Sequence, residues 1–204
     1  MLRDGRESFL RPCILGSFMS SSPTTLGSVG LALGSPAVDF HLKAVDGKSY
    51  SLRDFADRKA LVMVFSCNHC PYVQAYEDRM VRMQRDYSGK GVTLVAINSN
   101  DDHDYPEDSF ENMIRRAKDK GFNFPYLRDE TQDIARKYGA ICTPHVFAFD
   151  VHRTLQYKGR IDDNRNAADV KTHDLTNALD AMLAGRKPSV QETRPFGCSV
   201  KWKH

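Results

Sequence analysis

Two cysteines in the segment Cys67-Asn68-His69-Cys70-Pro71 are the residues of this chain best suited to chemistry. They directly follow an unalternating apolar run at residues 60–65, which predicts a strand buried on both faces. Two thiols at this spacing can close to a disulfide and reopen, or they can supply half of a zinc site. The rest of the chain decides between these two functions.

A redox role requires a thiolate, because the thiolate is the nucleophile and an ordinary cysteine is only about 3% ionised at pH 7. We expect Cys67 at or just before the N-terminus of a helix, where unpaired backbone N–H groups favour negative charge. His69 lies between the two thiols and can add positive charge or a proton. The sequence therefore predicts Cys67 as the nucleophile, Cys70 as the resolving thiol and His69 as the residue that tunes the thiolate.

A zinc site needs four ligands, which usually come from two close pairs. The other potential ligands are single and scattered: His69, Cys142, His145 and Cys198. We therefore expect no metal and no cofactor other than the redox-active Cys67–Cys70 disulfide itself. Two inert core thiols remain the simplest alternative.

The composition excludes several classes of protein. A formal net charge of +3 without a basic stripe argues against a nucleic-acid partner. No apolar run approaches the roughly 20 residues that span a bilayer, so no membrane partner is expected. Five cysteines in 204 residues are too sparse for a small disulfide-stapled secreted protein. A reducing compartment with one catalytic dithiol fits better.

The N-terminal residues 1–18 combine three arginines with an apolar patch that Arg11, Pro12 and Gly16 interrupt. A secretory signal needs an unbroken apolar core of roughly 7–15 residues. We therefore expect a cytoplasmic protein that begins near Met19, with an exported form as the alternative. The predicted organisation is a disordered N-terminal extension (1–34), one domain (35–188) and a C-terminal tail packed on or near it (189–204).

Hydrophobic periodicity predicts the order of the elements. A hairpin around Asp46-Gly47 comes first, followed by a short helical turn. We expect strands at residues 60–65, 92–97, 146–149 and 155–161. We expect helices at residues 106–120, 131–138 and 166–184, and a further helix whose apolar face runs from residue 73 to residue 87. Strand–helix–strand units demand parallel pairing, and a closing strand–turn–strand adds an antiparallel pair. The expected fold is α/β, with a central mixed sheet flanked by helices.

The segment Cys142-Thr143-Pro144 opens a predicted strand, which is unusual because proline cannot donate to a sheet ladder. A Cys-x-x-Cys before the first long helix, with Thr-Pro before a strand–strand–helix ending, resembles the thioredoxin-like fold. The chain is similar to its redoxin branch, near the alkyl hydroperoxide reductase C/thiol-specific antioxidant group, from about Gly34 onward. The segments that carry this resemblance are residues 35–40, 65–73, 96–101, 142–144, 159–163 and 197–203. The helix-bearing insertion at residues 99–130 also favours this branch.

The resemblance implies a thiol–disulfide oxidoreductase with an antioxidant or redox-homeostasis role. Its partners would be protein or small-molecule disulfides and a thiol reductant, and the oligomeric state stays open. Pro144 would be cis, and Thr143 would contact the substrate. Cys142 and Cys198 are candidate auxiliary thiols. Stabilisation of the reduced thiolate by His69 predicts a potential more oxidising than the roughly −270 mV of thioredoxin.

The chain also departs from its relatives. The buried acid of thioredoxin falls on Leu61 here, so the proton of Cys70 needs another route, through His69 or water. A peroxiredoxin has Thr or Ser three residues before its Cys-Pro, where this chain has Cys67. A thiol peroxidase that uses Cys70 or Cys67, with Arg128 or Arg160 as its arginine, is therefore the alternative. A non-catalytic thioredoxin-like binding module is the third hypothesis.

Overall fold

The computed structural model describes residues 30–204. Its strands are β1 (His41–Ala44), β2 (Ser49–Ser51), β3 (Ala60–Ser66), β4 (Val92–Asn98), β5 (Tyr126–Arg128), β6 (Cys142–Thr143), β7 (His145–Phe149), β8 (Leu155–Gly159) and β9 (Cys198–Ser199). Its helices are α1 (Pro71–Ser88), α2 (Phe110–Asp119), α3 (Asp133–Tyr138) and α4 (Asp174–Leu183), with 3-10 turns η1 (Leu52–Phe55), η2 (Pro106–Asp108) and η3 (Ala167–Asp169). None of these helices is both long and apolar enough to cross a membrane.

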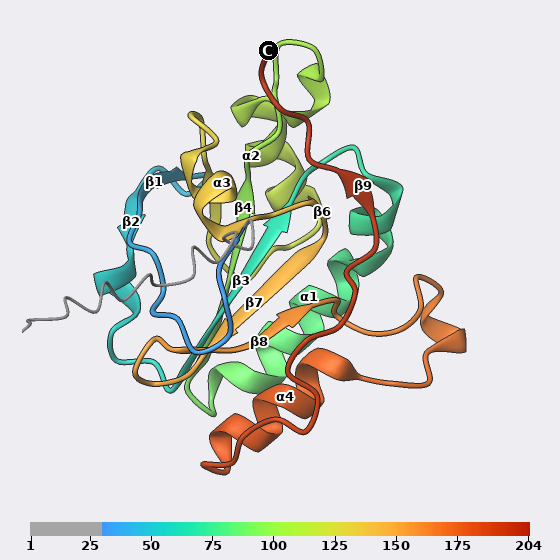
Figure 1. The fold of residues 1–204 in the computed structure, drawn as a ribbon. Helices are drawn as coiled ribbons and strands as arrows, with labels where there is room; N and C mark the ends of the chain where they lie inside the picture. The colour runs from blue at the N-terminus through green and yellow to red at the C-terminus, as the bar shows by residue number, and fades with distance from the viewer. Residues whose placement is uncertain (1–29) are drawn as a thin grey trace, which may run out of the picture.

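Seven strands form one mixed sheet in the order β2-β1-β5-β4-β3-β7-β8, and helices cover both of its faces (Figure 1). The central strand β3 pairs parallel with β4 and antiparallel with β7. The strands β6 and β9 form a separate two-stranded sheet. The predicted α/β architecture with a mixed sheet and an N-terminal hairpin is confirmed.

Alternate side chains of β3 divide the core into two layers. Ala60, Val62 and Val64 pack in the cluster that contains α1 and α4. Leu61, Met63 and Phe65 pack in the cluster that contains α3 and the hairpin. Because successive strand residues point to opposite faces, a strand covered on both sides must be apolar throughout, as residues 60–65 are.

Two predicted helices are shorter in the structure. The helix expected at residues 106–120 is divided, because Ser109 leaves helical geometry and caps α2 by accepting the N–H of Asn112. The helix expected at residues 166–184 begins only at Asp174. A carboxylate oxygen of Asp163 accepts the backbone N–H groups of residues 171 and 172, which holds the preceding segment as a loop.

Both ends of the described chain lie against the domain. The backbone N–H of Leu31 donates to Tyr138, and Leu31 and Leu33 pack on the core, so the packed domain begins before the expected boundary at residue 35. The C-terminal tail contributes β9, an element that the sequence analysis did not predict. The remainder of the predicted N-terminal extension, including Met19 and Cys13, lies outside the described residues.

Candidate active site

The dithiol lies in the loop that joins β3 to α1. The helix begins at Pro71, and Cys70 occupies the position immediately before it. Proline favours the first helical position, because it lacks the N–H that would be unpaired there and its φ angle suits the helix. The structure therefore corrects one expectation: Cys70, and not Cys67, lies at the helix N-terminus.

The surroundings of the two thiols shift their pKa values in opposite directions. The thiol of Cys67 donates to the sulfur of Cys70, which lowers the pKa of Cys70 to about 4, with further donors in the thiol of Cys198 and the backbone N–H groups of Val73 and Cys198. The same hydrogen bond, together with burial and the charge of Asp108, raises the pKa of Cys67. The carbonyl oxygen of Thr143 lies 3.2 Å from the Cys70 sulfur and would accept from a thiol there. Four donors against one acceptor favour the thiolate at Cys70.

The Thr143–Pro144 segment lies directly against the dithiol. The peptide bond between these residues is cis, as the resemblance implied. The hydroxyl of Thr143 lies 3.2 Å from the Cys67 sulfur. In this contact either the Thr143 hydroxyl or the Cys67 thiol can be the donor.

Asp108 is a site residue that the sequence analysis missed. Its side chain is fully buried and accepts hydrogen bonds from the backbone N–H of Asn68 at 2.6 Å, from Nδ2 of Asn100 at 2.8 Å and from Nδ1 of His69 at 2.6 Å. Because a carboxylate only accepts, Nδ1 of His69 carries a proton and Nε2 is left as its basic nitrogen. Asp108 thus fixes the tautomer and orientation of the histidine.

His69 is held next to the dithiol from both sides of its ring. The ring stacks on Tyr105 with centroids 5.3 Å apart and an interplanar angle of 11°. A ring nitrogen of His69, a carboxylate oxygen of Asp108 and the sulfur of Cys67 all lie within 4.8 Å of one another. Such a group could hold a metal ion, but four donors, with Nδ2 of Asn98 at 3.4 Å as the fourth, already occupy the carboxylate of Asp108. The arrangement suits proton transfer better than metal binding.

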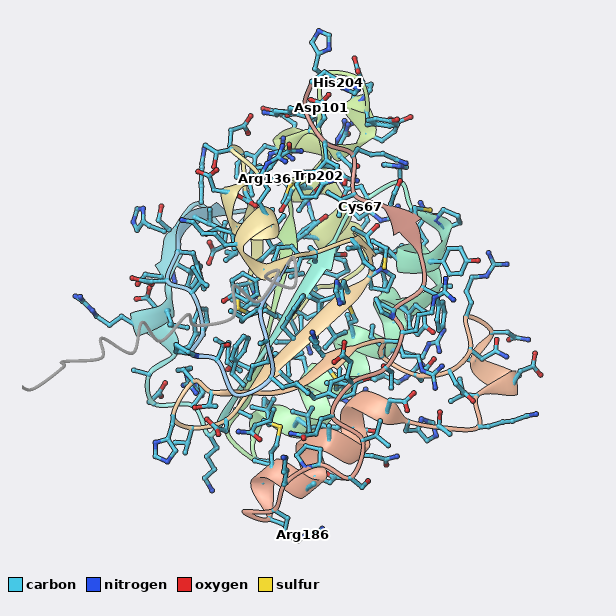
Figure 2. All side chains as sticks on the ribbon, viewed as in Figure 1. Cys67, Asp101, Arg136, Arg186, Trp202 and His204 are labelled. Carbon is cyan, nitrogen blue, oxygen red and sulfur yellow. The ribbon has the colours of Figure 1, made fainter. Side chains whose placement is uncertain are left out.

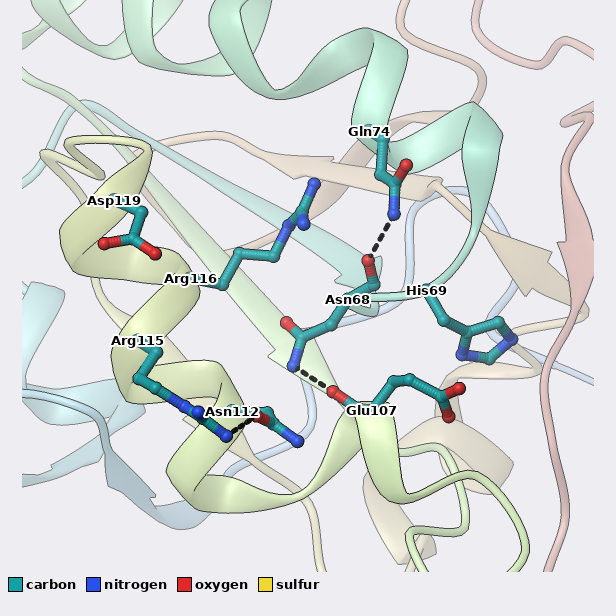
Figure 3. Close-up of a pocket in the computed structure, with 8 residues that line it drawn as sticks. All are labelled: Asn68, His69, Gln74, Glu107, Asn112, Arg115, Arg116 and Asp119. Carbon is teal, nitrogen blue, oxygen red and sulfur yellow. Dashed lines mark hydrogen bonds between the residues drawn. The ribbon is translucent and has the colours of Figure 1, made fainter.

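A pocket of about 430 Å³ opens beside this histidine. Figure 3 shows His69 and Asn68 on one side of the pocket and the α2 residues Arg115 and Arg116 on the other. The full lining is Asn68, His69, Gln74, Glu107, Asn112, Arg115, Arg116 and Asp119. Arg116 is also paired with the buried Glu77 of α1 at 2.5 and 2.8 Å, which fixes α2 against the dithiol helix.

The remaining candidate residues have other partners. Arg128 is buried between Asp102 and Glu130, and Arg160 pairs with Asp174 at 2.7 Å. In the described residues, neither arginine has a hydrogen bond or ion pair to a cysteine, so neither contacts the dithiol as a peroxidase arginine would. The thiol of Cys142 faces the carbonyl of Pro144, and burial raises its pKa to about 12.

Comparisons with known proteins show the family to which the chain belongs. A sequence model described as the AhpC/TSA family matches residues 33–158. The thiol-disulfide oxidoreductase ResA of Halalkalibacterium halodurans is 26% identical over 119 residues, which cover 58% of this chain and 63% of that relative, so the match spans less than two thirds of its length.

Two solved structures show the same fold. An uncharacterized conserved protein from Geobacillus kaustophilus is 44% identical, with a TM-score of 0.80 over 84% of this chain and 93% of that chain. The thioredoxin domain of a thiol-disulfide oxidoreductase from Bacteroides vulgatus is 17% identical, with a TM-score of 0.60 over 75% of this chain and 99% of that domain, and shows the fold alone. The matched sequence, the mixed sheet and the topology together show that this chain belongs to the AhpC/TSA family of thioredoxin-like redoxins.

Proposed function

We propose that this protein is a thiol–disulfide oxidoreductase that works through Cys67 and Cys70. The position of both thiols against the cis Thr143–Pro144 segment, with each sulfur 3.2 Å from an oxygen of Thr143, is the observation that carries the proposal. It brings the two thiols together at the start of α1, where the pKa of Cys70 is lowered. The relationship to ResA supports disulfides as the substrate class.

The low pKa of Cys70 reverses the roles that the sequence predicts. The Cys70 thiolate attacks one sulfur of a substrate disulfide, a mixed disulfide forms, and the other substrate sulfur leaves as a thiolate that takes up a proton. Cys67 then attacks the Cys70 sulfur, which closes the Cys67–Cys70 disulfide and releases the second substrate thiolate. An external thiol reductant returns the disulfide to the dithiol.

His69 supplies the route for the proton that Cys67 must lose in the second step. Its Nε2 can accept this proton because Asp108 holds the proton on Nδ1. The buried carboxylate also stabilises the imidazolium that results, at a distance where charge-assisted hydrogen bonds are strong. The sequence analysis left the proton of the resolving thiol to either His69 or water. Here His69, oriented by Asp108, is the group that accepts this proton.

A thiol peroxidase is the second candidate, because Cys70 combines a lowered pKa with a position at a helix N-terminus before Pro71. Attack of the Cys70 thiolate on a peroxide would give a sulfenic acid, and Cys67 would condense with it to the disulfide and release water. Consumption of hydrogen peroxide in a stopped-flow assay distinguishes the two activities. Peroxide turnover comparable to disulfide reduction would favour the peroxidase.

The test of the proposed function is reduction of insulin disulfides by dithiothreitol in the presence of the protein. We expect catalysis by the wild type and by the Cys142→Ser control, and a loss of at least about tenfold in both Cys67→Ser and Cys70→Ser. The Cys67→Ser variant should also accumulate a disulfide that involves Cys70, which peptide mass spectrometry detects. Wild-type rates in both serine variants would overturn the proposal.

A further inference from the structure

The C-terminal tail lies where an extended substrate would pair with Thr143. The strands β6 and β9 are antiparallel, with Thr143 opposite Cys198 and Cys142 opposite Ser199 (Figure 1). A Cβ atom at Gly197 would lie 2.0 Å from the carbonyl oxygen of Thr143. Since no side chain fits at that distance, glycine at this position permits the close approach of the two backbones.

This pairing places Cys198 against the dithiol. The carbonyl of Thr143 is 3.2 Å from the Cys70 sulfur, and Cys198 is the residue paired with Thr143. Hydrogen-bond donation from Cys67 and from Cys198 contributes to the lowered pKa of Cys70, which agrees with this placement. Cys70 therefore has two thiols near it, either of which could share a disulfide with it.

The three thiols differ in their contact with solvent. Cys67 is 2% exposed and Cys70 is fully buried, whereas Cys198 is only half-buried. A disulfide substrate that approaches the folded protein thus meets Cys198 before it meets either member of the dithiol. The fourth described cysteine, Cys142, is buried.

The tail is fixed on the domain and does not fray from it. The backbone N–H of Lys201 donates to Oδ1 of Asn100 at 2.9 Å, and the carbonyl of Lys201 accepts from Asp101 and Gln132 at 2.8 Å each. The next residue, Trp202, lies under the guanidinium of Arg136 at 4.5 Å (Figure 2). In this state, Cys198 is more exposed than Cys67 or Cys70.

We propose that Cys198 is a third redox-active cysteine, which relays disulfide exchange between solvent and the buried Cys67–Cys70 pair. This inference rests on the proposed function, because it needs a dithiol that exchanges. It gives a catalytic part to a cysteine that lies 128 residues from Cys70 in the sequence. It also explains why the tail carries a cysteine, and not an inert residue, opposite Thr143.

The relay balances at each step during reduction of a substrate disulfide. Burial and the neighbouring Cys70 raise the pKa of Cys198 to about 11, so its thiol first releases its proton to solvent and the sulfur then attacks one substrate sulfur. The other substrate sulfur leaves as a thiolate and is protonated. The Cys70 thiolate attacks the Cys198 sulfur, so that a Cys70–Cys198 bond forms and the second substrate thiolate leaves and is protonated. Cys67 loses its proton and attacks Cys70, so that the Cys67–Cys70 bond forms and Cys198 leaves as a thiolate and takes up a proton.

The first test traps the intermediate of this relay. All proteins carry Cys13→Ser, which leaves the four described cysteines as the thiols present. The Cys67→Ser variant is incubated with oxidised glutathione, alkylated and mapped by mass spectrometry. The relay predicts a Cys70–Cys198 disulfide in the majority of molecules. Glutathione that stays on a single cysteine, or a disulfide between Cys142 and Cys198, would overturn it.

The second test measures the rate at which oxidised glutathione forms the Cys67–Cys70 disulfide. We expect Cys198→Ser to be at least tenfold slower than the wild type, and the matched control Cys142→Ser to stay within twofold of it. A rate in Cys198→Ser equal to or above that of the wild type would overturn the relay.

The outcomes also distinguish the relay from the proposed function. If Cys198→Ser catalyses insulin reduction as fast as the wild type does, the relay is contradicted and the proposed function is not. A wild type that reduces no insulin, with a Cys70–Cys198 bond still formed in Cys67→Ser, contradicts the proposed function alone.

Discussion

Replacing Gly197 with alanine should displace the C-terminal tail from the dithiol. The new Cβ would begin 2.0 Å from the carbonyl oxygen of Thr143, and Cβ atoms essentially never approach closer than 3.0 Å. The tail must therefore move by roughly 1 Å, and such overpacking typically costs about 1–3 kcal/mol. For a chain of this length, the melting temperature should fall by about 2–12 °C.

The same movement should change the reactivity of Cys70 in two ways. Its sulfur would lose the donors of Cys198, and a hydrogen bond to a charged group is worth about 1.5–3 kcal/mol. One pKa unit corresponds to about 1.36 kcal/mol. Loss of the thiol and the backbone N–H of Cys198 as donors should therefore raise the pKa of Cys70 by on the order of 2–4 pKa units. Access to the sulfur should increase at the same time.

Alkylation of Cys70 by iodoacetamide, followed by mass spectrometry from pH 3 to 10, separates these effects. The plateau rate at high pH reports access and should rise in Gly197→Ala, whereas the midpoint reports the pKa and should move upward from about 4. Gly89→Ala is the matched control, because Gly89 follows α1 with φ −65° and nothing lies within 4 Å of its added Cβ. If the plateau rate and the midpoint pH of Gly197→Ala both equal those of the wild type, the inference that the C-terminal tail lies over Cys70 is refuted.

Three further results are expected. Between about pH 5 and 8 the reduced pair holds one thiolate and one thiol, so reduction of the disulfide takes up one proton for two electrons. The reduction potential of the Cys67–Cys70 pair should therefore fall by about 30 mV per pH unit, and a slope near 59 mV would show that both cysteines are thiols. Asp108→Asn should lower the free energy of unfolding in urea by about 3–5 kcal/mol, since one of the two buried carboxylate oxygens that accept four donors becomes an NH2 group that faces donors. The exposed control Asp104→Asn should change it by less than about 0.5 kcal/mol. His69→Ala should slow closure of the Cys67–Cys70 disulfide more at pH 6 than at pH 9, where hydroxide can remove the proton directly; an equal effect at both pH values would exclude His69 as the base.

The regular elements were predictable because their signals are local. The apolar run of β3 and the 3-4 spacing along α1 each lie within one segment, and burial on the sheet preserves them. The position of Cys70 directly before α1 was also predictable in principle. Pro71 is a strong signal for the first helical position, and weighting it fully would have placed the helix start after Cys70.

The rest of the site could not be predicted from local patterns. Asp108 reaches the dithiol from a short 3-10 turn 40 residues beyond Asn68, and an acidic residue in a polar loop resembles any exposed one. The strand β9 has two residues, too few for any periodicity, and its partner lies 55 residues upstream. Such contacts are set by tertiary packing and become visible only once the sheet is assembled.

The most direct test of the central claim is a titration of the reduced protein labelled with ¹³C at the cysteine Cβ atoms, which reports each thiol separately. The account predicts that Cys70 ionises near pH 4 and that Cys67 stays a thiol through pH 9. Ionisation of Cys67 before Cys70, or no ionisation of either thiol below pH 8, would contradict it.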